Sequence, residues 1–569
     1  MLESMTTRVL LLTVTAVAAG LQVQGQEPSV FGDSVDVDLV LVDVLVSDGD
    51  GNPLRDLTID DFQLYEDGRE VELSHFSPAP AAVSAAAGNS DVADTPGHRL
   101  VVFIDQIHIS PGSRKRVFSK LGDVLKKGLR PRDEVMVVAY EGTSKVLLPF
   151  STDRAKLREV LSAQQRFTAR SLVAGLGEER ILRLIESRNA DENDGEQGDP
   201  CVDLGYIART HAEQVHARVL QGVSELTEFV DSLAPYSGRK SLLHVSDGIP
   251  LVAGLAAYRF AIELCDGSGA AKGLANARNV ISDGSVLTRW DPTKAWSELT
   301  QFDTTAQWTA MAAHANTYQV SFYALQARGN STGRGARADG ARLSLDVEMD
   351  AMRNEQDPLF LLADETGGRA ILGTNDFGSV VTGMLEDSRA TYQLAYSAPT
   401  PGDGKQHKIR VEVALPGAEV KHRKSYSGKT SHQRLADSVL ATLFHGRRDN
   451  PMQASFAVQK EMLVDKRRVD VTLRLWFPLD RLTLLPEGEL NKGVFTVFVA
   501  ARDEHGRRTP VGRKIIPVEV ASEELHEGFT YEVVLPLRPG KHDVAIAVQD
   551  EVGHQTSFLS KAIEVGADG

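Results

Sequence analysis

The chain has 569 residues, a formal net charge of −16, 42% hydrophobic and 25% charged residues. These proportions are typical of a soluble globular protein, and the length predicts about three domains rather than one core. The acidic balance without a visible basic face argues against a nucleic-acid scaffold, so no nucleic-acid partner is expected.

Residues 1–25 carry the pattern of a secretory signal peptide. Arg8 supplies a positive start, Val9–Leu21 forms an apolar core, and Val23 and Gly25 offer small-residue positions before a cleavage point. The alternative is an uncleaved membrane anchor, which the shortness of the apolar run disfavours. We therefore expect an exported protein, periplasmic, cell-surface or secreted, with no integral membrane span after signal cleavage.

Residues 27–78 predict a small N-terminal β-domain. Apolar side chains recur in near-alternation from Val35 to Val44, and the Asp67-Gly68 pair is typical of a β-hairpin turn. Residues 79–97 are rich in Ala, Ser and Pro and lack apolar periodicity, which indicates a linker.

Residues 98–397 alternate strand-like and helix-like segments, which predicts a doubly wound, mainly parallel sheet. Two polar stretches, 186–208 and 266–310, interrupt the alternation and are interpreted as insertions that act as lids or flexible segments. The expected strands are 101–104, 134–140, 144–150, 242–245, 317–325 and 369–372, and the expected helices include 111–129, 215–233, 357–365 and 377–388.

The C-terminal third carries further β-patterns. Residues 398–431 predict a β-hairpin connector, and residues 432–566 contain alternating strands separated by turns, which predicts an antiparallel β-sandwich. The predicted fold class is thus a multidomain α/β plus all-β chain, with a central doubly wound sheet flanked by β-domains.

Two expected buried strands end in carboxylates. Val101–Ile104 is followed by Asp105, and Leu242–Val245 leads to Asp247. Ligands of open α/β sheets bind outside the carboxyl ends of the strands, and hard cations prefer oxygen ligands. These two carboxylates therefore predict a divalent cation site at that edge.

Several segments, in order over roughly residues 38–400, resemble a von Willebrand factor A domain of the bacterial exported VWFA-related group. They are DLVLVDVLVSDGDGNPLRDLTIDDFQLYEDG, HRLVVFIDQIHISP, GRKSLLHVSDG, FYALQARG, DETGGRAILGTNDF and YQLAYSAP. The resemblance implies a protein-binding or adhesion role and a metal-ion-dependent adhesion site with Mg²⁺, or Mn²⁺ or Ca²⁺.

In that family the site uses Asp-x-Ser-x-Ser after the first strand, with a Thr and an Asp on later loops. Asp105 matches the first position and Asp247 the late aspartate, and Thr168 is the candidate threonine. Ile107 and Ile109 stand where the two serines belong. The resemblance therefore implies a degenerate site that lacks two neutral oxygen ligands.

Residues around Asp105 also have structural interpretations. Ser110 can offer an oxygen in shifted register, but Ser followed by Pro111 is a standard helix N-cap. His108 suits softer metals than Mg²⁺, and a packed or hydrogen-bonded histidine is the simpler interpretation. Asp105 can accept backbone N–H bonds at the following helix start.

Cys201 and Cys265 are the only cysteines. Export places them in an oxidising compartment, which favours a disulfide, with two buried thiols as the alternative. No G-x-S-x-G, H-E-x-x-H or phosphate-loop motif is present, so an enzyme is not expected. We expect an exported adhesion-type module that docks a protein partner through the α/β domain. The alternatives are a structural scaffold of an envelope assembly with a vestigial metal site and an envelope hydrolase with lid-like insertions.

Overall fold

The computed structural model describes residues 39–79, 97–166, 172–190, 200–236, 238–276, 292–330, 343–446, 449–465, 467–524 and 528–566. The predicted signal peptide, most of the predicted linker and Thr168 lie outside these ranges. No helix in the described ranges is both long and apolar enough to cross a bilayer.

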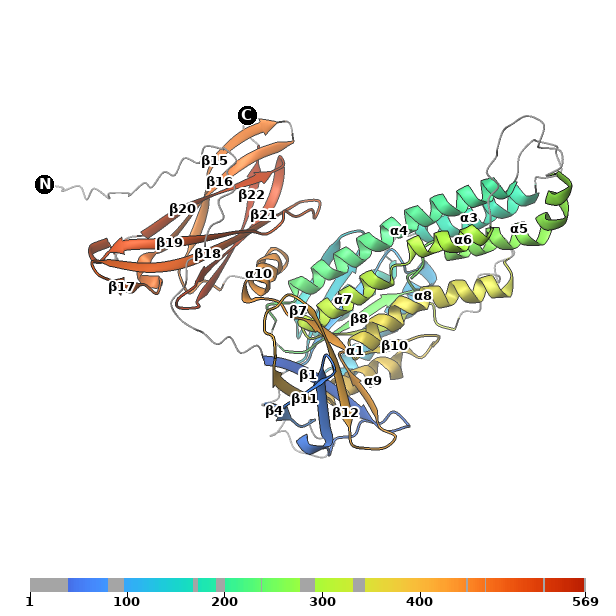
Figure 1. Cartoon of the computed structure of the whole chain (residues 1–569), viewed down its shortest axis with the longest axis horizontal. Coiled ribbons are helices and arrows are strands. Elements are labelled where there is room, and N and C mark those ends of the chain that lie inside the picture. The colour runs from blue at the N-terminus through green and yellow to red at the C-terminus, as the bar shows by residue number, and fades with distance from the viewer. Residues whose placement is uncertain are drawn as a thin grey trace. The chain divides into compact units, whose positions relative to one another are not determined.

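A six-stranded sheet forms the centre of the chain, in the order β10-β9-β8-β5-β6-β7 (Figure 1). Its neighbouring strands are parallel except for the edge pair β6–β7, which is antiparallel. The expected mainly parallel sheet is thus confirmed. Its strands are β5 (Arg99–Asp105), β6 (Glu134–Tyr140), β7 (Ser144–Ser151), β8 (Lys240–Ser246), β9 (Val320–Gln326) and β10 (Arg369–Ile371).

Helices cover both faces of this sheet, because the buried strands direct apolar side chains to both faces. Val102 and Ile104 of β5 pack with helices α1, α2 and α9, whereas Val101 and Phe103 pack with α4, α7 and α8. These helices are α1 (Pro111–Gly128), α2 (Arg154–Ala163), α4 (Pro200–Ser232), α7 (Thr305–Thr317), α8 (Leu345–Glu365) and α9 (Phe377–Arg389).

The two predicted insertions are helical where the structure describes them. Helices α3 (Leu172–Ala190), α5 (Leu255–Asn276) and α6 (Pro292–Leu299) pack with the first halves of α4 and α8 around a separate apolar core. We call this the helical extension, and its helices run alongside one another in Figure 1. The second half of α4 contributes Val219 and Phe229 to the sheet's core, so one helix joins both cores.

A disulfide between Cys201 of α4 and Cys265 of α5 links two helices of the helical extension, with the Cα atoms 5.8 Å apart. The predicted disulfide is confirmed. Apolar Leu204, Ala208 and Ala261 pack in the same core, so the bond ties together helices that the hydrophobic core also holds.

Two four-stranded sheets build a β-sandwich from segments far apart in the sequence. One sheet runs β13-β1-β11-β4 and the other β14-β12-β2-β3. The strands of residues 27–78 and of 398–431 therefore pair with each other, and the α/β domain lies between them in the chain. The strands are β1 (Leu39–Ser47), β2 (Phe62–Glu66), β3 (Arg69–Val71), β4 (His75–Ser77), β11 (Tyr392–Ser397), β12 (Gln406–Val413), β13 (Glu419–His422) and β14 (Ser425–Ser427).

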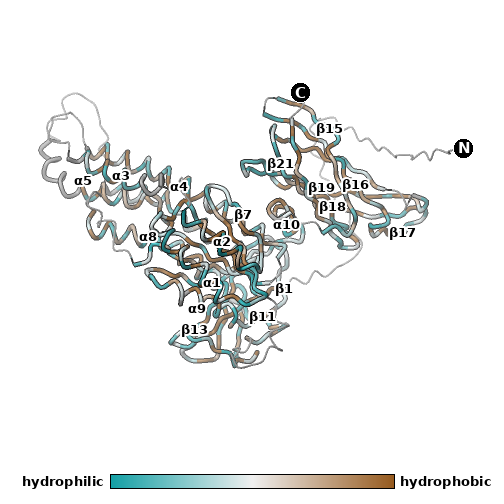
Figure 2. The backbone as a smooth tube through the Cα atoms, turned by 180° about the vertical axis from the view of Figure 1, so that it is seen from behind, coloured by the Kyte–Doolittle hydropathy of each residue, from teal (hydrophilic) through white to brown (hydrophobic). Residues whose placement is uncertain are grey.

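The C-terminal residues form antiparallel sheets, as expected. A three-stranded sheet, β15-β16-β20, and a sheet of β17, β18, β19, β21 and β22 both contribute to one apolar core. Hydrophobic stretches of these strands are brown in Figure 2. Helix α10 (Ser431–His445) precedes them and packs on β18 and β21. The strands are β15 (Ser455–Asp465), β16 (Arg468–Pro478), β17 (Leu485–Glu487), β18 (Leu490–Asp503), β19 (Gly512–Ala521), β20 (Gly528–Leu537), β21 (Gly540–Asp550) and β22 (Thr556–Val565).

Candidate functional site

Asp105 is the last residue of β5, and its side chain turns toward the face covered by α4 and α7. It is 2% exposed. Its Oδ1 atom accepts the backbone N–H groups of Ile107, at 3.0 Å, and of His108, at 3.1 Å. One carboxylate oxygen is thus used to hold the loop that follows the strand, which is the structural role considered from the sequence.

The other carboxylate oxygen of Asp105 contacts the His108 ring, with 2.8 Å between Oδ2 and Nδ1. Burial alone would raise the pKa of Asp105, but the charge and hydrogen bond of His108 hold that pKa below its ordinary value. Burial alone would lower the pKa of His108, and Asp105 instead raises it. The pair is therefore an internal ion pair, with an imidazolium beside the carboxylate.

A second histidine approaches the same carboxylate from β8. His244 Nε2 lies 3.9 Å from Asp105 Oδ2, and the ring stacks on Phe103. Burial lowers the pKa of His244 to about 4, despite the attraction of Asp105, so this imidazole is neutral. A small cavity of about 10 Å³ lies beside it and is lined also by Tyr140 and Trp308.

Asp247 and Ser110 meet on the neighbouring loop. Asp247 Oδ2 accepts the backbone N–H of Ser110 at 2.8 Å, and Asp247 N–H donates to the His108 carbonyl at 2.6 Å. Ser110 Oγ accepts the N–H of Ser113, so Ser110 is the N-cap of α1 with Pro111 at its first position. Ser110 and Oδ2 of Asp247 thus fix the loop geometry, whereas Oδ1 of Asp247 is buried and has no hydrogen-bond partner among the described residues.

The oxygen donors around Asp105 do not fit a hard divalent cation. Ile107 packs against the core on one face of the sheet and Ile109 belongs to the core on the other, so neither position offers an oxygen. Both oxygens of Asp105 have partners within the chain. Hard cations require several oxygen ligands, and the residues after β5 offer fewer side-chain oxygens than such an ion needs.

Helix α8 covers the loop that follows Asp247. Pro358 lies inside α8 and has no N–H to give to the carbonyl of Asn354, one turn earlier. The N–H of Leu251 donates to that carbonyl instead, at 3.0 Å, and the N–H of Ile249 donates to the carbonyl of Glu355 at 3.0 Å. The proline thus frees a backbone acceptor that anchors the loop to α8.

The outer face of α8 carries apolar side chains at helical spacing. Leu345 is 70% exposed and Phe360 54%, with Met349 and Met352 between them at 36% and 38%. We call these four residues the α8 stripe. Single exposed apolar residues are ordinary, but an aligned set on one helix face is typical of an interaction surface. Methionine is frequent on adaptable binding surfaces.

A cavity of about 310 Å³ adjoins the α8 stripe at the carboxyl ends of β9 and β10. Met352 and Gln356 line it from α8, and Gln326 lines it from the end of β9. Arg328 and Asn330 complete much of the remaining wall. The cavity therefore combines one apolar side chain with amide donors and acceptors, at the sheet edge where α/β proteins bind ligands.

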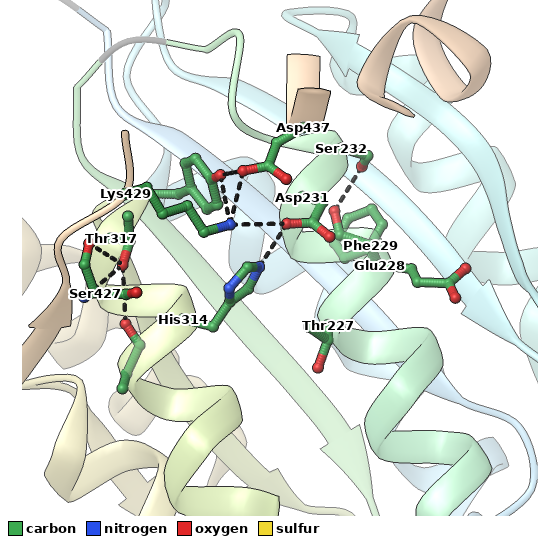
Figure 3. Close-up of polar contacts among 12 residues, drawn as sticks. Thr227, Glu228, Phe229, Asp231, Ser232, His314, Thr317, Ser427, Lys429 and Asp437 are labelled. Carbon is green, nitrogen blue, oxygen red and sulfur yellow. Dashed lines mark hydrogen bonds and ion pairs between the residues drawn. The ribbon is translucent and has the colours of Figure 1, made fainter. Parts of the chain in front are cut away.

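A second polar cluster lies where α4, α7 and α10 meet (Figure 3). The Lys429 ammonium lies 2.7 Å from Asp437 and 3.7 Å from Asp231, and Asp231 also contacts His314. Burial, with the nearby charge of Asp231, raises the pKa of Asp437. These ion pairs join α10 to the α/β domain, which is a structural role.

No family model matches the chain, and no curated protein matches it. Among solved structures, it is similar to an aerotolerance-related membrane protein from Bacteroides fragilis (12% identity, 52% of this chain and 98% of that one, TM-score 0.22). It is also similar to a pilus adhesin of Lactobacillus rhamnosus GG (9%, 91% and 58%, 0.24) and to a von Willebrand factor type A protein from Catenulispora acidiphila (11%, 83% and 66%, 0.19). With TM-scores this low, no property of those proteins is carried over to this chain.

Proposed function

We propose that this chain is an exported protein-binding module of the von Willebrand factor A type that docks its partner through the α8 stripe and the adjoining cavity. The observation that carries the proposal is the stripe itself, from Leu345 to Phe360, beside a cavity of about 310 Å³. Apolar side chains of the partner would pack on the stripe, and a polar side chain would enter the cavity. There the Gln356 carbonyl oxygen, whose own Nε2 donates to Gln326, would accept a hydrogen bond from the partner.

The proposed docking needs no cation at Asp105. His108 supplies the positive charge next to that carboxylate, and α8 anchors the loop after Asp247. An adhesion site of the family type would require an open metal position, and the donors around Asp105 do not supply the ligands for one. The partner's contacts would therefore be apolar and hydrogen-bonded.

The disulfide supports export independently of the N-terminal residues. Disulfides form and persist in oxidising compartments and are rare in the cytosol. Cys201 and Cys265 are bonded and are the only cysteines of the chain, so the protein is suited to a periplasmic, surface or secreted location.

Site-specific photo-cross-linking in the producing cells tests the docking surface. A photoreactive residue at Met352 should yield one defined protein adduct, whereas the same residue at exposed Lys126 of α1, which covers the other face of the sheet, should not. Phe360→Lys should reduce the Met352 adduct at least tenfold, and EDTA should leave it unchanged.

The scaffold function is the second candidate, favoured by the closed geometry around Asp105. It predicts no adduct at Met352, or equal adducts at Met352 and Lys126. An adduct that disappears with EDTA would instead support cation-dependent docking and would contradict our proposal.

A further inference from the structure

A second set of charged side chains gathers in the β-sandwich formed by the strands around residues 39–77 and 392–427, away from the α8 stripe. Glu66 ends β2, Asp67 occupies the following hairpin turn, and His407 lies on β12. One ligand-type atom from each of these residues lies within 4.8 Å of the others. Among the residues that the structure describes, no other His, Cys or acid set meets that criterion.

The distances suit a small metal ion. His407 Nδ1 lies 2.9 Å from Asp67 Oδ2 and 3.5 Å from Glu66 Oε1. Ligands that bind Zn²⁺ at about 2.0–2.1 Å in a tetrahedral arrangement lie about 3.3 Å from one another. These two distances lie on either side of that spacing, and the ligand atoms of Glu66 and Asp67 lie within 4.8 Å of each other, so small side-chain movements would bring the three atoms around one ion.

Each of the three residues has two polar side-chain atoms. One of them forms a hydrogen bond elsewhere in the protein, and the other faces the point between the three side chains. The tyrosine hydroxyls of Tyr396 and Tyr426 donate to Glu66 Oε2, at 2.5 and 3.1 Å. Glu66 is 4% exposed, and its Oε1 lies 3.5 Å from His407 Nδ1. A carboxylate oxygen of a buried residue is thus directed at the centre.

The same arrangement holds for the other two ligands. The backbone N–H of Lys408 donates to Asp67 Oδ1 at 2.8 Å, which leaves Oδ2 for the centre. His407 Nε2 lies 3.0 Å from Asp403 Oδ1, so an Nε2–H donated to that carboxylate leaves the Nδ1 lone pair free to bind a metal. Carboxylate-oriented histidines of this kind are typical of metal sites.

Two further features are consistent with a bound cation. The carboxylates of Glu66, Asp67 and Asp403 surround the single imidazole of His407. A protonated His407 would balance one of their three negative charges, whereas a divalent ion would balance two. Gly428 leaves the space that the Asp403–His407 pair needs, because a Cβ there would lie 2.9 Å from Asp403 Oδ1 and 3.3 Å from His407 Nε2. The Asp67 side chain is half exposed, which gives an ion access from solvent.

We propose that Glu66 Oε1, Asp67 Oδ2 and His407 Nδ1 bind a divalent transition metal ion, with Asp403 as the residue that orients His407. The mixed nitrogen and oxygen set favours Zn²⁺ over Mg²⁺ or Ca²⁺, because imidazole is a poor ligand for the hard cations. Three protein ligands leave a coordination position for water. This site is independent of the α8 stripe.

Isothermal titration of the mature chain with Zn²⁺ tests the proposal. We expect one Zn²⁺ per chain. Asp403→Asn should weaken binding about 10- to 100-fold, as changes to metal-orienting residues do, and Asp67→Asn should weaken it more. Asp67→Asn retains an oxygen for the Lys408 N–H, so it should fold. His432→Asn, at another histidine–carboxylate pair, is the control and should bind as the parent chain does.

Thermal unfolding gives a second measurement on the same proteins. Zn²⁺ should raise the unfolding temperature of the parent chain and of His432→Asn, EDTA should reverse the rise, and Asp67→Asn should show none. Equal Zn²⁺ affinity in the parent chain and Asp67→Asn, or no binding to the parent chain, would overturn the metal site and leave an imidazolium held by carboxylates.

Discussion

His108 Nδ1 lies 2.8 Å from Asp105 Oδ2, so a side chain from the loop after β5 neutralises the carboxylate at the end of that strand. Asp105 is only 2% exposed to solvent, and a buried carboxylate requires a partner charge and hydrogen bonds. In this chain both come from the loop itself. We therefore expect the α/β domain to fold without an added ion at this position.

Removing the imidazole should destabilise the domain strongly. His108→Ala leaves the Asp105 carboxylate buried without a charge partner, which costs about 3–5 kcal/mol. Asp105→Asn should cost less, and the double variant less than the sum of the two, because the side chains act as a pair. Chemical denaturation measures these losses, with His432→Ala as a more exposed control. A loss for His108→Ala no larger than for the control would contradict the ion pair.

The ion pair predicts a pH dependence with a definite sign. The pKa of His108 is raised above its ordinary 6.5, so its contribution to stability is present below that value and is lost as the pH rises through the raised pKa. The pKa of Asp105 is lowered below 3.8, so its contribution is lost only as the pH falls through the lowered pKa. The stability difference between the parent chain and Asp105→Asn should be largest between these limits. A stability difference between the two proteins that increases as the pH becomes alkaline would contradict the ion pair between His108 and Asp105.

Glu225 of α4 gives a second pH effect. Burial and the charge of Glu228 raise its pKa to about 7 from 4.5, although the Ser144 N–H bond acts in the opposite direction. The folded state therefore retains a proton that the unfolded chain releases, and stability falls as the pH rises from 4.5 to about 7. Glu225→Gln should remove this part of the pH dependence of stability. The variant should therefore be more stable than the parent chain at pH about 8 but not at pH about 5, as measured by chemical denaturation. Parallel stability–pH profiles of the two proteins would contradict the raised pKa of Glu225.

The disulfide should stabilise the helical extension. The bond joins residues 64 apart in sequence, and a loop of that length corresponds to about 4 kcal/mol in the chain-entropy model. A chain with both Cys201→Ser and Cys265→Ser should unfold at a lower temperature and exchange amide hydrogens of α5 faster. Non-reducing mass spectrometry of exported material should find the linked peptide, and free thiols there would disprove the bond.

Local patterns predicted the elements of the α/β domain well. The buried run at Val101–Ile104 is a strand, and the periodicity after Pro111 is a helix that ends at Gly128. Helix α8 was predicted to start at Asp357, but it starts at Leu345. Pro358 interrupts the usual hydrogen-bond pattern, and only the tertiary contact from Leu251 restores it, which no local pattern reveals.

The pairing of strands that are far apart in the chain could not be predicted from local sequence patterns. Strand β1 pairs with β11, and β2 with β12, although the whole α/β domain separates them in the sequence. Segments that were predicted as separate β-units therefore form common sheets. The carboxylates of Glu66 and Asp67 meet His407 only through that pairing. His108 is three residues from Asp105, but the direction of its ring toward the carboxylate depends on the loop conformation. The α8 stripe was also missed, because Leu345, Met349 and Met352 precede the predicted start of the helix at Asp357.

The most direct test of the central claim, that His108 takes the place of a metal ion beside Asp105, is thermal unfolding of the mature Asp67→Asn chain in Mg²⁺, Mn²⁺, Ca²⁺ and EDTA. The Asp67→Asn change removes the separate site proposed in the β-sandwich. Our account predicts the same unfolding temperature in all four solutions. A rise with Mg²⁺ that disappears in the further variant Asp105→Asn would show that a cation binds there and would contradict the account, since a ligand at a hundredfold excess over Kd adds about 2.7 kcal/mol.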